Sequence, residues 1–266
     1  MQLEIIHQTP QEPNGQSLLF VHGMWHGAWC WQVNFLPFFS NLGYDCYALS
    51  LRNHGKSDSN KAIWRVRIKD YVEDLRQAVK SIGKNPILAG HSMGGFIVQK
   101  YLEKHTAPAV ILLASVPPYG IIGPTIKVVK KFPLSFIKAN LTIDLKKIIA
   151  NKAAAKHLLF SSSLSDEKTT LYHAQLQSEA YIGYIEMLGL NLPKTKKITP
   201  PKMLVIGAEN DRVISPKAIQ KTANTYHASV SVIPDIAHDV MLDSNWELVA
   251  NRMQEWLESS RAGKNS

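Results

Sequence analysis

A serine, an aspartate and a histidine, in that order along the chain, supply the parts of a nucleophilic catalyst: Ser92, Asp211 and His238. A serine hydroxyl attacks a carbonyl carbon only when a base removes its proton and a third group holds that base. Each of the three follows an apolar run that is typical of a buried strand. We therefore expect acyl-transfer chemistry, with Ser92 as the nucleophile, His238 as the base and Asp211 as the group that orients the histidine.

Ser92 lies in a Gly-x-Ser-x-Gly sequence, between Gly90 and Gly94. Such a sequence is typical of a sharp strand-to-helix turn that lifts the serine hydroxyl clear of a sheet. The apolar residues 87–89 precede it, and a helix-like pattern begins at Met93. Because both glycines lack a Cβ atom, strand and helix can close around the turn. An ordinary glycine-rich loop is the alternative interpretation.

The proposed acid and base each follow a late predicted strand. Asp211 comes shortly after the strand 203–206, and His238 follows the strand 229–233. Side chains in such positions gather beyond the carboxyl ends of a parallel sheet. Glu209 and Asp235 are alternative acids, although each could equally be a solvated loop carboxylate.

Two backbone N–H groups must bind the oxyanion of the tetrahedral intermediate. The Met93 N–H lies at a helix N-terminus, and the Met24 N–H follows Gly23, where the backbone can turn. The loop that carries Met24 is rich in tryptophan and must reach the reacting carbon. We expect it to line the substrate pocket through Gly23, Trp25, His26 and Trp29; core packing of the tryptophans is the alternative. His91, beside the nucleophile, and His54 read as structural histidines.

The elements that position these residues alternate between strands and helices. Strands are predicted at 3–6, 17–21, 44–51, 87–89, 109–115, 203–206 and 229–233, and helices at 31–42, 68–82, 93–104, 215–226 and 246–258. This alternation predicts an α/β fold with a mostly parallel sheet covered on both faces. The segment 120–200 contains no convincing strand and is too long for a simple crossover. We interpret it as a helical cap inserted between two parts of one core, 1–119 and 201–266.

Composition bounds the class of protein. The chain has 266 residues, of which 45% are hydrophobic, enough for one large domain with a core. Its two cysteines, Cys30 and Cys46, have no metal-type spacing, and no signal peptide is evident, so we expect a cytoplasmic protein. A long stretch without charged residues, 106–126, contains four prolines and reads as strand and loop rather than a membrane span.

The positive charge is concentrated in the predicted cap. Twelve lysines and five acidic residues between 120 and 200 account for +7 of the net charge of +9. The cap has no arginine, the residue best suited to phosphate and base recognition, which argues against nucleic acid. Either its lysines simply face water, or they attract an anionic substrate or the surface of an anionic membrane. The oligomeric state is not predictable from the sequence.

Taken together, these motifs resemble the α/β-hydrolase superfamily over essentially the whole chain. The run from His22 to Trp31 resembles the branch of plant methylesterases and hydroxynitrile lyases, and bacterial esterases with similar loops. The lyases typically carry Thr where this chain has Gly23, and Lys where it has Asp239, so both departures favour ester hydrolysis. Ser92 in place of Asp argues against haloalkane dehalogenases and epoxide hydrolases. The loop from Arg52 to Gly55 resembles the Arg-Gly-His-Gly of the family, with Asn53 in place of a usual Gly.

The sequence therefore predicts a serine hydrolase that cleaves a small-molecule carboxylic ester through an acyl-enzyme. Neither a cofactor nor a metal is expected, because no zinc-type motif, phosphate-binding loop or dinucleotide fingerprint is present. An acyltransferase would use the same residues with another nucleophile in place of water. The same motifs are also compatible with a cofactor-free lyase or oxygenase, and with a ligand-binding receptor on this fold.

Overall fold

The computed structural model describes residues 1–262 and contains a seven-stranded sheet with the order β1-β3-β2-β4-β5-β6-β7. The strands are β1 (Ile5–Gln8), β2 (Ser17–Val21), β3 (Asp45–Leu49), β4 (Ile87–His91), β5 (Ala109–Leu113), β6 (Lys202–Ala208) and β7 (Ser229–Ile233). Only the pair of β1 and β3 is antiparallel. The predicted α/β fold with a mostly parallel sheet is confirmed.

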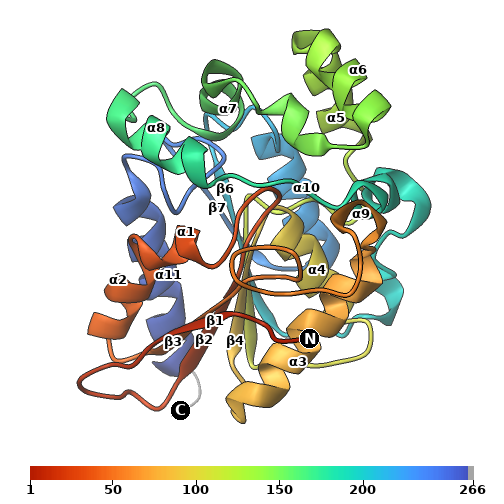
Figure 1. Ribbon diagram of the computed structural model, residues 1–266. Coiled ribbons are helices and arrows are strands. Elements are labelled where there is room, and N and C mark those ends of the chain that lie inside the picture. The colour runs from red at the N-terminus through yellow and green to blue at the C-terminus, as the bar shows by residue number, and fades with distance from the viewer. Residues whose placement is uncertain (263–266) are drawn as a thin grey trace.

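The central strands are buried along their whole length. Every residue of β2, β4 and β5 is buried, as expected for parallel strands covered on both faces. The covering helices are α1 (Trp29–Gln32), α2 (Phe35–Asn41), α3 (Ile68–Ile82), α4 (Met93–Tyr101), α10 (Pro216–Tyr226) and α11 (Trp246–Ala262). Figure 1 shows α2 and α11 on one side of the sheet, and α3, α4 and α10 on the other.

One of the predicted helices is in fact two separate helices. The apolar pattern at 31–42 predicted a single helix, but α1 ends at Gln32 and α2 begins at Phe35. Asn34 interrupts them with a φ of −131°, and its side-chain amide donates a hydrogen bond to the Met241 carbonyl at 2.8 Å. A tertiary contact therefore overrides the local helical periodicity.

The residues between β5 and β6 contain no strand in the part of the chain that the structure describes. They form α5 (Ile122–Lys131), α6 (Pro133–Thr142), α7 (Lys152–Leu159), α8 (Asp166–Gln175) and α9 (Tyr181–Ile185), with short turns between them. We call residues 120–200 the cap segment, and its assignment as a separate unit stays a prediction. Figure 1 shows α5 and α6 projecting at the top of the molecule. The last predicted core part, 201–266, is described up to residue 262.

No helix among residues 1–262 is both long and apolar enough to cross a membrane. The two cysteines, Cys30 and Cys46, are buried and free.

The turn between β4 and α4 depends on close backbone contacts. Ser92 has a φ of +49°, in the left-handed region that residues with a side chain rarely occupy. A Cβ atom on Gly90 would lie 2.6 Å from the Gly94 carbonyl oxygen, and one on Gly94 would collide with the Val21 carbonyl. The two glycines therefore let α4 pack directly onto the ends of β4 and β2, as the Gly-x-Ser-x-Gly sequence suggested.

We expect Gly94→Ala to destabilise the fold by at least about 3 kcal/mol, since backbone atoms cannot move aside as a flexible side chain could. For a chain of this size this corresponds to a fall in Tm of roughly 6–12 °C. Gly123→Ala is the matched control, because a Cβ atom at Gly123 would meet nothing within 4 Å and this residue lies inside α5. Thermal unfolding followed by circular dichroism should show the control unchanged or slightly stabilised. Equal melting temperatures for the two variants would contradict this account of the turn.

Candidate active site

The structure brings Ser92, His238 and Asp211 into one hydrogen-bonded chain. His238 Nε2 lies 3.0 Å from Ser92 Oγ, and His238 Nδ1 lies 2.8 Å from Asp211 Oδ2. All three side chains are buried. Ser92 comes from the turn after β4, Asp211 from the loop after β6 and His238 from the loop after β7, so three strand ends converge on one point.

Asp211 is held by its own loop. Its Oδ1 atom accepts hydrogen bonds from the backbone N–H groups of Val213 at 2.7 Å and Ile214 at 2.8 Å. This leaves Oδ2 directed at the histidine, which fixes the ring in the tautomer with a proton on Nδ1. The alternative acids Glu209 and Asp235 are exposed, and neither contacts His238. The geometry therefore selects Asp211 as the partner of the histidine.

The surroundings of His238 favour its protonated form. Burial of the ring opposes protonation, but the Asp211 carboxylate, with a smaller contribution from Asp239, more than offsets this and raises the pKa of His238 above 6.5. Proton transfer from Ser92 creates an imidazolium, so the same carboxylates would stabilise the state that forms during attack.

His91 holds the loop that carries His238. Its Nε2 atom donates to the His238 carbonyl oxygen at 2.9 Å. Burial, together with the neighbouring His238, lowers the pKa of His91 to about 3, so the ring is neutral at physiological pH. His91, His238 and Asp239 form a group whose potential metal-ligand atoms lie within 4.8 Å of one another. Because both ring nitrogens of His238 already face Ser92 and Asp211, a metal ion there would compete with the hydrogen-bonded chain.

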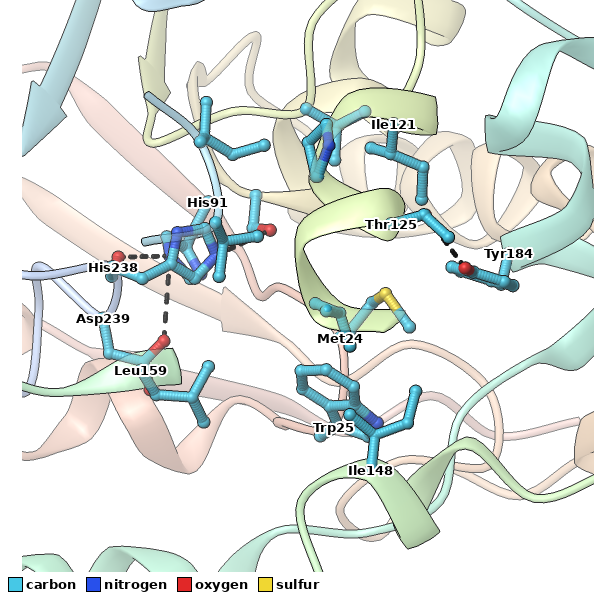
Figure 2. A pocket seen from close by; sticks show the side chains of 16 residues that line it. Met24, Trp25, His91, Ile121, Thr125, Ile148, Leu159, Tyr184, His238 and Asp239 are labelled. Carbon is cyan, nitrogen blue, oxygen red and sulfur yellow. Dashed lines mark hydrogen bonds and ion pairs between the residues drawn. The ribbon is translucent and has the colours of Figure 1, made fainter. Parts of the chain in front are cut away.

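An apolar cavity adjoins Ser92 and His238. Figure 2 shows side chains around it from the loop after β2, from the turn between β4 and α4 (residues 90–94, the elbow), which includes His91, and from the cap segment. The cap contributes Thr125 and Val128 from α5 and Tyr184 from α9, and the Thr125 hydroxyl lies 2.9 Å from that of Tyr184. The full lining is Met24, Trp25, His91, Ser92, Val116, Ile121, Pro124, Thr125, Val128, Ile148, Leu159, Tyr184, Val213, Ile214, His238 and Asp239. None of these is a lysine or an arginine.

The predicted pocket residues divide into two groups. Trp25 lines the cavity, whereas Gly23, His26 and Trp29 do not. A Cβ atom on Gly23 would lie 2.7 Å from His91 Nδ1, so this residue is where the loop touches the elbow. The His26 ring turns into the protein interior and stacks on Trp29, with 5.4 Å between ring centroids. The prediction failed for these residues because spacing along an irregular loop does not determine which way each side chain points.

The peptide between Gly23 and Met24 has a defined orientation. His22 Nδ1 donates to the Gly23 carbonyl at 2.8 Å, and His22 Nε2 accepts from the Leu51 N–H at 3.1 Å. Both contacts require a neutral ring, and burial together with the nearby His54 lowers the pKa of His22 well below 6.5. The carbonyl and N–H of a trans peptide point in opposite directions, so His22 also restrains the Met24 N–H from the side of the preceding residue.

Two buried acids near the site were missed by the sequence analysis as functional residues. Glu179, from the cap segment, lies 3.3 Å from His54 Nε2 and accepts a hydrogen bond from the Tyr71 hydroxyl at 2.7 Å. Burial opposes ionisation of Glu179, but His54 outweighs it and lowers the pKa of the carboxyl group. The second acid, Asp239, lines the cavity beside His238. Its position directly after the histidine was a local signal, whereas nothing in the sequence around Glu179 marked it.

Comparison with known proteins agrees with this geometry. Residues 18–252 match the family described as alpha/beta hydrolase. The chain belongs to this family. The resemblance inferred from the motifs is thus confirmed.

Similar family members include proteins named as esterases and a lipase. The probable esterase PIR7A of Oryza sativa is 31% identical over 146 residues, which cover 53% of this chain and 53% of that protein. The alignment thus spans about half the length of this relative. A monoacylglycerol lipase of Mycolicibacterium smegmatis is 25% identical over 237 residues, covering 83% of this chain and 80% of that protein.

Solved structures share the fold. A carboxylesterase of Nitrososphaera gargenis superposes with a TM-score of 0.77 at 16% identity, covering 98% of this chain and 96% of that one. The esterase EaEST of Exiguobacterium antarcticum gives a TM-score of 0.77 at 15% identity, with 96% and 95% covered. At these identities the likeness concerns the fold alone.

The raised pKa of His238 predicts the acid limb of the activity profile. Only the neutral ring can take the proton of Ser92, so kcat/KM should fall about tenfold per pH unit below a pKa that lies above 6.5. In Asp211→Asn the main group that raises this pKa is gone, and the midpoint of the residual activity should move to lower pH. The measurement is kcat/KM for an uncharged ester across the pH range. The assignment of His238 as the base would be contradicted if the midpoint of this fall lay at or below pH 6.5 in the parent and did not move in the variant.

Proposed function

We propose that the protein is a carboxylic ester hydrolase of the serine type. The single observation that carries this proposal is the chain from Ser92 through His238 to Asp211 at the wall of an apolar cavity. In the first step Ser92 Oγ attacks the acyl carbon while His238 takes the hydroxyl proton. The histidine then returns this proton to the departing alcohol, which leaves an acyl-enzyme.

The second half of the reaction uses the same groups. Water, deprotonated by His238, attacks the acyl-enzyme and releases the acid. The backbone N–H groups of Met24 and Met93 are the proposed donors to the oxyanion in both tetrahedral intermediates. Met24 is supported by its place in the cavity wall and by the fixed peptide that precedes it. Met93 is supported by its position as the first residue of α4.

The lining of the cavity favours a neutral, apolar substrate. It contains no lysine or arginine, and the Asp239 carboxylate adds a negative charge. Burial opposes the ionisation of Asp239, but the neighbouring His26 outweighs it and lowers the pKa of the carboxyl group. An ester with an anionic acyl chain would therefore meet repulsion without a compensating cation. We place any attraction to anions on the outer surface of the cap segment instead.

Acyl transfer is the second candidate, because the same residues would form the same acyl-enzyme. The two reactions differ only in the nucleophile that enters after the first alcohol leaves. Product analysis in the presence of added alcohols distinguishes them: a transferase yields new esters, whereas a hydrolase yields the acid. A cytoplasmic location also remains a proposal, supported by two buried, unpaired cysteines.

The parent protein should hydrolyse p-nitrophenyl esters, with a preference that depends on acyl length because the cap helices form part of the cavity wall. Ser92→Ala, His238→Ala and Asp211→Asn should each lower kcat by at least about 10³-fold while the melting temperature stays close to that of the parent. Double variants should be little worse than single ones, since the three groups act as a unit. An inactive parent across the whole ester series would overturn the proposed function, and an active Ser92→Ala variant would overturn the assignment of the nucleophile.

An anionic lipid surface is the partner that we propose for the cap. On α6, Leu134, Ile137 and Leu141 are 81%, 55% and 81% exposed, and their spacing places them on one side of the helix. On α5, Ile122 and Ile126 are 56% and 49% exposed. Exposed large apolar side chains in such a cluster commonly mark an interaction surface.

The charge around this apolar cluster has a single sign. Lys127, Lys130, Lys131 and Lys138 are exposed, and residues 120–143 contain no acidic residue. Apolar side chains flanked by lysines suit an interface with anionic headgroups. The opposite side of α5 supplies Thr125 and Val128 to the cavity, so an apolar ester could pass from the lipid to the site.

Replacing Lys127, Lys130 and Lys131 with glutamine should lower binding to anionic vesicles by about 100-fold, at about 1 kcal/mol for each lysine. The assay is co-sedimentation of the Ser92→Ala protein with phosphatidylcholine vesicles, with and without phosphatidylserine, so that turnover cannot disturb it. Glutamine at Lys194, Lys196 and Lys197, which lie elsewhere in the cap segment, removes the same charge and should have a much smaller effect. Equal losses in both triple variants, or no binding by the parent, would mean that these lysines only solubilise the protein.

A further inference from the structure

The peptide unit between Met24 and Trp25 has both of its polar atoms bound by buried side chains. The Met24 carbonyl accepts a hydrogen bond from His26 Nδ1 at 2.7 Å, and the Trp25 N–H donates to Glu179 Oε2 at 3.1 Å. Trp25 has a φ of +67°, a left-handed conformation that costs about 1 kcal/mol or more for a residue with a side chain. This backbone needs support, and the two side chains supply it.

Each supporting side chain is itself half of a histidine–carboxylate pair. His26 Nε2 lies 3.0 Å from Asp239 Oδ2, and Glu179 Oε2 lies 3.3 Å from His54 Nε2. All four side chains are no more than 1% exposed. Both ring nitrogens of His26 face oxygen atoms, the Met24 carbonyl and the Asp239 carboxylate. Because an unpaired buried charge is costly, each pair resists separation and keeps its members in place.

The two pairs connect the oxyanion loop to separate parts of the molecule. Asp239 directly follows His238 in the loop after β7, whereas Glu179 belongs to the cap segment. A third contact reinforces the cap side, since the Trp25 carbonyl accepts a hydrogen bond from the Gln177 N–H at 2.9 Å. The loop that carries the proton acceptor and the loop that carries the proposed oxyanion donor are thus joined through Asp239 and His26.

We propose that His26 and Asp239 are positioning residues, which hold the Met24 carbonyl so that the preceding Met24 N–H points at the developing oxyanion. The inference rests on the proposed ester hydrolysis. An oxyanion donor stabilises the intermediate only when its N–H points at the negatively charged oxygen. Removing such a donor entirely costs about 10²–10³-fold in kcat. A donor that is present but badly aimed should cost roughly 10–100-fold. The loss should fall on kcat rather than KM, because the oxyanion exists only in the transition state and the intermediates.

Two variants of His26 separate positioning from simple filling of space. The amide nitrogen of asparagine reaches the place of Nδ1, so His26→Asn retains a donor to the Met24 carbonyl. The amide nitrogen of glutamine reaches the place of Nε2, so His26→Gln loses that donor. Both are made together with Asp239→Asn, which removes the buried carboxylate that would otherwise lose its histidine partner. The pair therefore differs in one hydrogen bond and not in charge.

With p-nitrophenyl butyrate, the kcat of the His26→Asn double variant should lie within about 5-fold of Asp239→Asn alone, and that of the His26→Gln double variant about 10–100-fold below it. KM should stay within about 3-fold in both. The second-order rate of phosphonylation by a fluorophosphonate should fall by the same factor as kcat, because this reaction also builds negative oxygen beside Ser92. His7→Gln is the control, since His7 forms a pair with Asp45 at 2.6 Å on the edge strand β1 and should leave every value unchanged.

Asp239→Asn alone covers the case in which neither double variant folds. A His26 ring with its proton on Nδ1 still donates to the Met24 carbonyl while Nε2 accepts from the new amide. The loss in kcat, which comes from the missing carboxylate beside His238, should therefore stay below about 100-fold. A loss of more than about 100-fold at an unchanged melting temperature would overturn the positioning role and place Asp239 in the chemistry itself. Equal kcat and phosphonylation rates in the two folded double variants would also overturn it. A parent that neither hydrolyses esters nor reacts with the fluorophosphonate would overturn the proposed function, and this inference with it.

Discussion

The contact between the end of β2 and the turn after β4 is the constraint on which the rest of the site depends. Gly94 rests against the Val21 and His22 carbonyls, and Gly23 rests against His91 and Ser92. Each strand end therefore fills the space that a side chain on the other would need. This mutual approach sets the separation between the nucleophile and the loop that follows β2. The backbone atoms of these two strand ends therefore determine how far Ser92 lies from the loop after β2, and the other parts of the site, including the cap segment, pack around them.

Four buried histidines surround this contact, two with lowered pKa values and two with raised ones. Burial lowers the pKa values of His22 and His91, which act as neutral hydrogen-bond partners for backbone groups. His54 and His238 are buried as well, but Glu179 and Asp211 outweigh the burial and raise their pKa values. A carboxylate within 3.3 Å, rather than the depth of burial, therefore distinguishes the two rings with raised pKa values from the two with lowered ones.

The sequence predicted what depends on neighbours along the chain. The helix α3 begins and ends where its periodicity and Gly83 indicated, and Asp211 and His238 were found because each follows a strand. The contact between Trp25 and Glu179 joins residues 154 positions apart, and no local pattern encodes it. Asn53 shows a departure from the family motif that only the structure explains. Its φ of +63° lies in the left-handed region, which accounts for the usual glycine at this position, and asparagine tolerates this conformation better than most residues.

The two-sided nature of α5 would couple the two proposed binding events, of substrate inside and of lipid outside. One side of this helix supplies Thr125 and Val128 to the cavity, and the other exposes Ile126 and Lys130. The Thr125–Tyr184 hydrogen bond ties the inner side to α9, so a shift of α5 alters the cavity wall. A ligand that binds the outer side and favours one position of α5 changes the affinity for substrate. By thermodynamic reciprocity, a bound substrate changes the affinity of the outer side by the same factor.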